Sequence, residues 1–171
     1  ESEKLQKEII EKLGGVVKIA EVISNSSRIE DLEENLENAN FYSGKRNKIS
    51  YSISAFNTNL LSFVEDFLKD FFKSMKLKAI YKKNSSPSKL INQDVLNNGV
   101  DIVIYKNAVG KTVAVTNPKE LKERDISRPS VDYKKSISLR LAKILINISK
   151  IKENETLLDP FCGNGGILQE A

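Results

Sequence analysis

The residues from Leu158 to Ala171 constrain the fold and function of this chain more than any other part. They read Leu-Asp-Pro-Phe-Cys-Gly-Asn-Gly-Gly-Ile-Leu-Gln-Glu-Ala. An apolar run over 156–158 meets an acid, and a glycine-rich turn and the start of a helix follow. This order predicts the first strand, loop and helix of an α/β fold of the nucleotide-binding type. In such folds, ligands bind at the carboxyl ends of the strands.

The glycines of this turn, Gly163, Gly165 and Gly166, indicate a close approach of the backbone to a ligand. Because they lack Cβ atoms, their N–H groups can reach a ligand at the amino end of a helix. The dinucleotide fingerprint G-x-G-x-x-G does not fit, because Leu168 stands where its third glycine belongs. A phosphate-binding P-loop does not fit either, because no lysine follows the glycines.

The same residues resemble the cofactor loop of the S-adenosyl-L-methionine-dependent methyltransferases that act on amino groups of nucleic-acid bases. The resemblance implies that Asp159 binds the methionine amino group, that Gly163 and Gly165 let the backbone approach the ligand, and that Phe161 shapes the pocket. Asn164 stands where relatives usually have Ser or Thr. The cofactor-binding residues that the resemblance implies are Asp159, Pro160, Phe161, Cys162, Gly163, Gly165 and Gly166. Cys162 has no histidine in the chain to activate it as a nucleophile, so we expect a structural role for it.

Three upstream segments point to a narrower family. Residues 124–129 (Arg-Asp-Ile-Ser-Arg-Pro) and 136–147 are similar to stretches of the THUMP-containing tRNA guanosine-N2 methyltransferases, although Ile137 replaces the usual Met and Leu139 the usual Pro. Residues 18–22, after Gly14-Gly15, are similar to the N-terminal module of that family. The resemblance implies a parent enzyme that methylates N2 of guanine, at guanosine 10 of tRNA, and an N-terminal region that grips the tRNA.

The family also carries a D-P-P-Y-type motif that holds the target amine, and an acid that binds the cofactor ribose. Neither is present in these residues, so we expect no catalytic residue here and no catalysis by this polypeptide alone. The alternatives left open are a non-catalytic RNA-binding module, one half of a split methyltransferase completed by a second chain, and a DNA amino methyltransferase.

The pattern of apolar residues predicts an α/β chain in which a THUMP-like α+β domain precedes the first β-α unit of a Rossmann-like methyltransferase domain. The predicted limits are 1–116 for the RNA-binding region, 117–135 for a charged connector and 136–171 for the start of the catalytic domain. Helices are expected over 5–13, 28–36, 60–75, 86–96 and 137–148. Strands are expected over 16–23, 49–55, 79–81, 100–105, 112–115 and 156–158, with a turn over 107–110.

Charge is distributed unevenly along the chain. Residues 1–40 hold 5 Lys/Arg and 10 Asp/Glu, whereas residues 41–135 hold 18 basic and 9 acidic residues. A basic middle favours a polyanionic partner such as tRNA, because each cation that contacts a phosphate releases counterions. A solvated lysine-rich surface is an equally good explanation on charge alone. The candidate RNA-binding residues are Lys82, Lys83, Lys89 and Arg128.

Composition limits the other classes of protein. The single cysteine excludes an internal disulfide framework, and the absence of histidine argues against a zinc site, so we expect no metal ligands. No apolar stretch approaches the roughly 20 residues that cross a bilayer, so no membrane partner is expected. We therefore expect a cytoplasmic protein.

Overall fold

The computed structural model describes residues 8–42, 44, 47–83, 99–127 and 136–171. The chain divides into two compact units. We call Lys18–Val115 the sheet unit, and Glu1–Val17 together with Thr116–Ala171 the helical unit. The predicted helix over 86–96 lies outside the described residues. Each unit is described by itself below.

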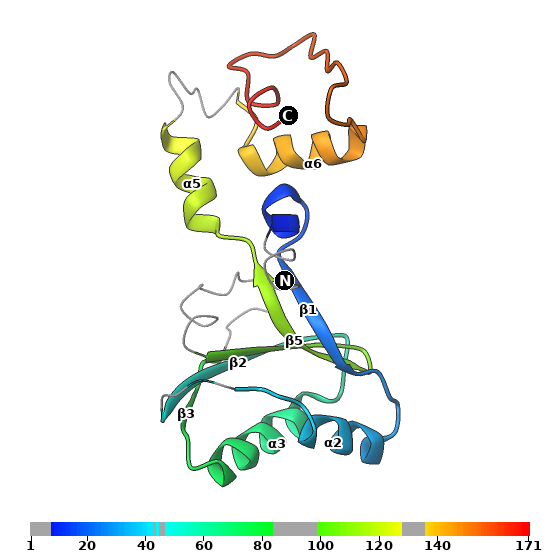
Figure 1. Cartoon of the computed structure of the whole chain (residues 1–171), viewed down its shortest axis with the longest axis vertical. Helices are drawn as coiled ribbons and strands as arrows, with labels where there is room; N and C mark the ends of the chain where they lie inside the picture. Colours follow the sequence, from blue (N-terminus) through cyan, green and yellow to red (C-terminus); the bar gives the residue numbers. More distant parts are fainter. Residues whose placement is uncertain (1–7, 43, 45–46, 84–98, 128–135) are drawn as a thin grey trace. The chain divides into compact units, whose positions relative to one another are not determined.

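The sheet unit is built on a five-stranded mixed sheet in the order β1-β5-β4-β2-β3 (Figure 1). Strand β2 pairs in parallel with β3 and β4, while β5 pairs antiparallel with β1 and β4. Helices α2 and α3 lie together on one side of this sheet (Figure 1). The expected α/β fold class is therefore confirmed. The strands are β1 (Lys18–Ser24), β2 (Lys48–Phe56), β3 (Lys78–Tyr81), β4 (Gly99–Tyr105) and β5 (Ala108–Val115), and the helices are α2 (Ile29–Glu37) and α3 (Leu61–Ser74).

The hydrophobic core lies between the sheet and these helices. Along β2, Ile49, Tyr51 and Ile53 alternate with serines, so one face of the strand is apolar. The buried stripe of α3 recurs at helical spacing and packs against that face. Its members are Val64, Leu68 and Phe72, each 0% exposed. This match of a period-2 strand face to a helical stripe is why the predicted segments 49–55 and 60–75 form as expected.

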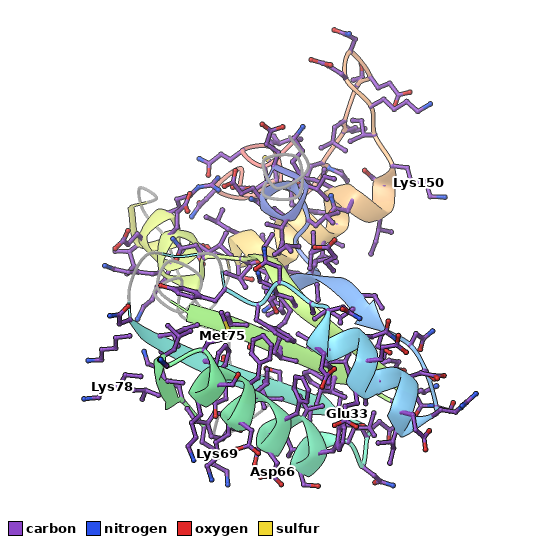
Figure 2. The ribbon with its side chains drawn as sticks, turned by 60° about the horizontal axis from the view of Figure 1, so that its bottom comes forward. Glu33, Asp66, Lys69, Met75, Lys78 and Lys150 are labelled. Carbon is purple, nitrogen blue, oxygen red and sulfur yellow. The ribbon has the colours of Figure 1, made fainter. Side chains whose placement is uncertain are left out.

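The outer faces of these helices carry charge. Glu33 on α2 and Asp66 and Lys69 on α3 point outward from the helices, and Lys78 extends from the edge strand β3 (Figure 2). All of these side chains belong to exposed residues. The helices therefore present a solvated surface on the side away from the core.

A buried polar network lies on the other side of the sheet. Asp101 of β4, whose side chain is 0% exposed, accepts hydrogen bonds from Ser52 of β2 at 2.9 Å and from Thr112 of β5. Lys18 of β1 lies 3.3 Å from the Asp101 carboxylate and donates to Ser54 of β2 at 2.9 Å. Burial raises the pKa of Asp101 and lowers the pKa of Lys18, and each shift is opposed by the partner's charge. The network satisfies buried groups that would be costly alone, and it links β1, β2, β4 and β5.

The hairpin between β4 and β5 is tighter than predicted. Tyr105 pairs directly with Ala108, so Lys106 and Asn107 form the turn, and the expected turn over 107–110 is wrong. Lys106 has a φ of 54°, which a short hairpin turn requires. Gly110 lies inside β5, where a Cβ atom would stand 2.7 Å from the Glu21 carbonyl oxygen. Glycine serves close strand packing there rather than turning.

The helical unit contains a short helix over 8–12, α5 (Pro118–Ser127) and α6 (Leu139–Ser149). The first part of the segment 117–135, predicted as a charged connector, forms α5. Asn117 accepts hydrogen bonds from the N–H groups of Lys119 at 3.2 Å and Glu120 at 3.3 Å, and Pro118 occupies the first helical position, which proline tolerates. The rest of the connector, 128–135, lies outside the described residues.

Helix α6 holds the end of the 8–12 helix through polar side chains. Lys143 donates to the Glu11 carbonyl at 2.6 Å, Arg140 to the Gly14 carbonyl at 3.1 Å and Asn147 to the Lys12 carbonyl at 3.2 Å. The Asn147 side-chain oxygen also accepts from the Gly14 N–H at 3.1 Å. Helix carbonyls without intrahelical partners are thereby satisfied. These bonds explain why residues 8–17 fall in the helical unit. The limits of the RNA-binding region, 1–116, stay a prediction.

This contact generates a stability prediction with an adjacent control. A Cβ atom on Gly14 would lie 2.6 Å from the Arg140 carbonyl oxygen and 2.6 Å from the Ile144 nitrogen, whereas on Gly15 the nearest atom is 3.8 Å away. We expect Gly14→Ala to lower the free energy of unfolding by about 1–3 kcal/mol, because backbone atoms of α6 would have to move. Gly15→Ala should leave it within about 0.5 kcal/mol.

Urea unfolding followed by circular dichroism measures both changes, and hydrogen exchange of the α6 amides locates the effect. Equal unfolding free energies for the two variants would show that Gly14 does not pack closely against α6.

Candidate cofactor site

The C-terminal segment is less regular than the sequence predicts. Thr156–Leu158 forms no strand, and no regular helix follows Gly166; residues 160–170 form turns instead. An isolated extended segment gains no ladder hydrogen bonds, and no described strand pairs with these residues. Leu158 is accordingly 83% exposed. The helical character that is present consists of Gln169 N–H bonding to Gly165 O at 2.9 Å and Ala171 N–H bonding to Ile167 O at 3.1 Å.

The acid and the glycines nevertheless form an ordered turn. Asp159 accepts a hydrogen bond at 3.0 Å from the N–H of Phe161, which is the short-range bond that Asp makes in turns. The N–H of Gly165 then donates to Cys162 O at 2.8 Å. Gly163 has a φ of 50° and Gly165 a φ of 73°, both in the left-handed region that favours glycine. Backbone conformation therefore explains the glycines at 163 and 165.

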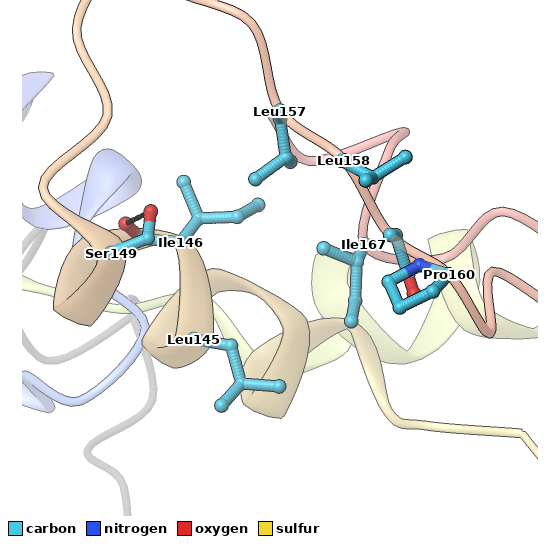
Figure 3. Close-up of a pocket in the computed structure, with 8 residues that line it drawn as sticks. Leu145, Ile146, Ser149, Leu157, Leu158, Pro160 and Ile167 are labelled. Carbon is cyan, nitrogen blue, oxygen red and sulfur yellow. Dashed lines mark hydrogen bonds between the residues drawn. The ribbon is translucent and has the colours of Figure 1, made fainter.

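Asp159 lies at a hollow in the helical unit. The hollow has a volume of about 200 Å³, and its walls come from α6 on one side and the segment 157–167 on the other (Figure 3). Ligand pockets for whole cofactors usually measure about 300–1,000 Å³, so this hollow has room for part of such a ligand. The lining residues are Leu145, Ile146, Ser149, Leu157, Leu158, Asp159, Pro160 and Ile167.

The residues present fit the amino-acid part of a sulfonium cofactor. Among the described residues, the only hydrogen bond to the Asp159 carboxylate comes from Phe161 at Oδ1, which leaves Oδ2 for an ammonium group. A Cβ atom on Gly165 would meet nothing within 4 Å, and one on Gly163 only the Phe161 carbonyl at 3.9 Å. The space beside these glycines is therefore open to a ligand, as the sequence requires.

The structure places the predicted cofactor residues unequally. Asp159 and Pro160 line the hollow, and Gly166 is buried. Phe161, Cys162, Gly163 and Gly165 do not line it, and Phe161 is 92% exposed. The expected role of Phe161 in shaping the pocket stays a prediction.

Of the predicted RNA-binding residues, Lys82 and Lys83 are exposed just after β3. Lys89 and Arg128 lie outside the described residues. Lys83 borders a second hollow of about 240 Å³ in the sheet unit. There the Tyr81 hydroxyl donates to the Glu65 carboxylate at 2.6 Å, and burial together with this bond raises the pKa of Tyr81. The sequence did not predict this pair, because it joins α3 to β3 only through tertiary packing.

Other kinds of site are not supported by the described part of the chain. It holds no group of His, Cys, Asp and Glu side chains suited to a metal ion. Within the same residues, no helix has the length and apolar character needed to span a membrane.

Comparison with known proteins shows which family the C-terminal segment is similar to. Residues 128–171, which include the glycine turn and Asp159, match the family described as RMKL-like, methyltransferase domain. This match agrees with the methyltransferase resemblance of the cofactor loop.

The chain is also similar to individual proteins whose names specify a substrate. Over 95 residues, 52% of this chain, it is 32% identical to the tRNA (guanine(10)-N2)-dimethyltransferase of Methanocaldococcus jannaschii, of which it covers 25%. It is 51% identical over 39 residues, 23% of this chain, to the enzyme of the same name from Methanothermobacter thermautotrophicus, of which it covers 12%. A probable tRNA (guanine(10)-N2)-dimethyltransferase of Methanothermococcus thermolithotrophicus is 55% identical over 31 residues, with 18% of this chain and 19% of the relative covered. The predicted similarity to tRNA guanine-N2 methyltransferases is thus confirmed, and the chain spans about a quarter or less of each relative's length. Its THUMP-like character stays a prediction.

Proposed function

We propose that this chain is the N-terminal part of a tRNA methyltransferase that transfers a methyl group from S-adenosyl-L-methionine to N2 of guanine, at guanosine 10 of tRNA. One observation carries the proposal. Asp159 lines a hollow immediately before a turn with left-handed glycines, inside the segment that matches a methyltransferase domain family. The names of the similar proteins support tRNA as the substrate and guanine as the methylated base.

The roles of this chain's own residues follow from their chemistry. When bound, the cofactor supplies an electrophilic methyl group on a positively charged sulfur. Asp159 would hold the ammonium of its methionine part through a charge-assisted hydrogen bond. The open sides of Gly163 and Gly165 would let backbone atoms lie against the ligand. The apolar wall from Leu145 and Ile146 would exclude water from that end of the site.

We assign the reaction itself to residues of the parent protein outside this chain. The described residues hold a candidate for binding the cofactor, and none of them is assigned to activate the guanine amine. We therefore expect the 171-residue polypeptide alone to be inactive.

The sheet unit is the proposed tRNA-binding region, with THUMP-like character. Lys82 and Lys83 are exposed at the end of β3, where they can reach phosphates. The Tyr81 ring stacks on Tyr51 at 5.1 Å between centroids, a contact between β3 and β2 next to these lysines. A tRNA substrate would place the reaction in the cytoplasm.

Asp159→Ala tests the cofactor site. In the full-length parent, we expect this change to raise the dissociation constant of S-adenosyl-L-methionine at least about tenfold, because a hydrogen bond to a charged group contributes about 1.5–3 kcal/mol. Isothermal titration calorimetry measures it. Asp66→Ala, an exposed acid on α3, is the matched control and should bind like wild type. A dissociation constant for Asp159→Ala equal to that of the wild type would refute the assignment of this residue.

Lys82→Ala/Lys83→Ala tests the RNA-binding surface. We expect weaker tRNA binding and a salt dependence whose logarithmic slope is smaller by about 1 for each lysine that contacts a phosphate. Lys119→Ala/Lys122→Ala removes the same charge from exposed positions of α5 and should leave the slope unchanged. Fluorescence anisotropy across a salt series measures both. Equal slopes in the two variants would contradict this surface.

Binding and activity measurements on the same proteins distinguish the alternative functions. A DNA amino methyltransferase would prefer duplex DNA to tRNA in competition binding. A non-catalytic RNA-binding module would bind tRNA but show no saturable affinity for S-adenosyl-L-methionine. A split enzyme would recover methyl transfer only when a second chain with the remaining catalytic residues is added.

A further inference from the structure

The Glu170 carboxylate is buried in the helical unit and held by cations from two helices. The Glu170 side chain is only 3% exposed, whereas the two preceding residues, Leu168 and Gln169, are exposed. Arg124 of α5 forms an ion pair and hydrogen bond with Oε1, and Lys143 of α6 lies 3.6 Å from Oε2. A carboxylate is removed from water at high cost unless it is paired in this way. The position of Glu170 is therefore set by α5 and α6.

Backbone hydrogen bonds connect Glu170 to the glycine turn. The N–H of Glu170 donates to Ile167 O at 3.1 Å, and the N–H of Gln169 donates to Gly165 O at 2.9 Å. Gly165 in turn bonds to Cys162 at 2.8 Å, three residues beyond Asp159. Since residues 160–170 form turns without a strand or regular helix to stiffen them, such anchors decide their shape.

Lys143 is itself held by a second contact, and the residue after Arg124 is bonded to the start of α6. Lys143 also donates to the Glu11 carbonyl at 2.6 Å, and its side chain is only 16% exposed. Next to Arg124, Asp125 accepts a hydrogen bond at 3.3 Å from the N–H of Leu139, the first residue of α6. Neighbouring residues of α5 therefore bind the C-terminal segment and the start of α6.

We propose that Glu170 is a positioning residue for the cofactor loop: the Arg124–Glu170–Lys143 cluster holds the glycine turn in the shape that binds the cofactor. The proposal rests on the proposed function of Asp159 and its turn. It gives Arg124 a role in cofactor affinity through Glu170, without contact with the ligand.

The test compares variants of the full-length parent by calorimetric titration with S-adenosyl-L-methionine. Arg124→Met and Glu170→Gln should each raise the dissociation constant about tenfold or more, and Arg124→Lys should recover part of the loss because it keeps the charge. Lys119→Met is the matched control: it breaks another ion pair of α5, to Glu123 at 3.8 Å, whose side chains are 84% and 65% exposed. Such an exposed pair contributes little, so this variant should bind like wild type.

Kinetics separate positioning from a general loss of structure. A positioning role predicts that KM for the cofactor rises several-fold while KM for tRNA stays within about twofold, at a temperature where circular dichroism shows every variant folded. Equal increases of both KM values would overturn the proposal, as would wild-type affinity in Arg124→Met. If Glu170→Gln fails to fold, Arg124→Met decides, because Arg124 is 44% exposed at the surface. Absence of cofactor binding by the wild-type parent would instead refute the proposed function.

Discussion

The candidate site depends on the hydrogen bonds and the ion pair that side chains of helix α6 make with the neighbouring segments. Its polar side chains bind the carbonyls of residues 11, 12 and 14, and Lys143 reaches both Glu11 and the Glu170 carboxylate. The same helix supplies Leu145, Ile146 and Ser149 to the wall of the hollow beside Asp159. A segment with little regular structure of its own is thereby placed against a rigid surface, which is what a binding turn needs.

Much of the fold could be predicted because its signals are local. The alternation of β2 and the apolar stripe of α3 both describe one-sided burial, and the structure pairs these two faces in a single core. The failures have separate physical reasons. Residues 156–158 have the composition of a strand but pair with no described strand. The turn predicted over 107–110 lies at Lys106 and Asn107 instead, because Gly110 serves close strand packing inside β5. The Asp101 network was not predicted, because it joins residues far apart in the sequence.

The candidate site divides in the same way. Asp159 and the left-handed glycines could be predicted from a contiguous motif, because every part of that turn lies within a few residues of the next. The cluster of Arg124, Lys143 and Glu170 could not, since Arg124 and Glu170 are 46 residues apart and neither has a local pattern that names its partner. The sequence thus predicts which groups face the proposed ligand, while tertiary structure shows which contacts hold those groups in place.

A crystal structure of the full-length parent with S-adenosyl-L-homocysteine would show whether the turn after Asp159 receives the amino-acid end of the cofactor. We expect the Asp159 carboxylate within hydrogen-bonding distance of the ligand's ammonium group, with the ligand against Gly163 and Gly165. A ligand bound elsewhere, with Asp159 still bonded only to the Phe161 N–H, would contradict it.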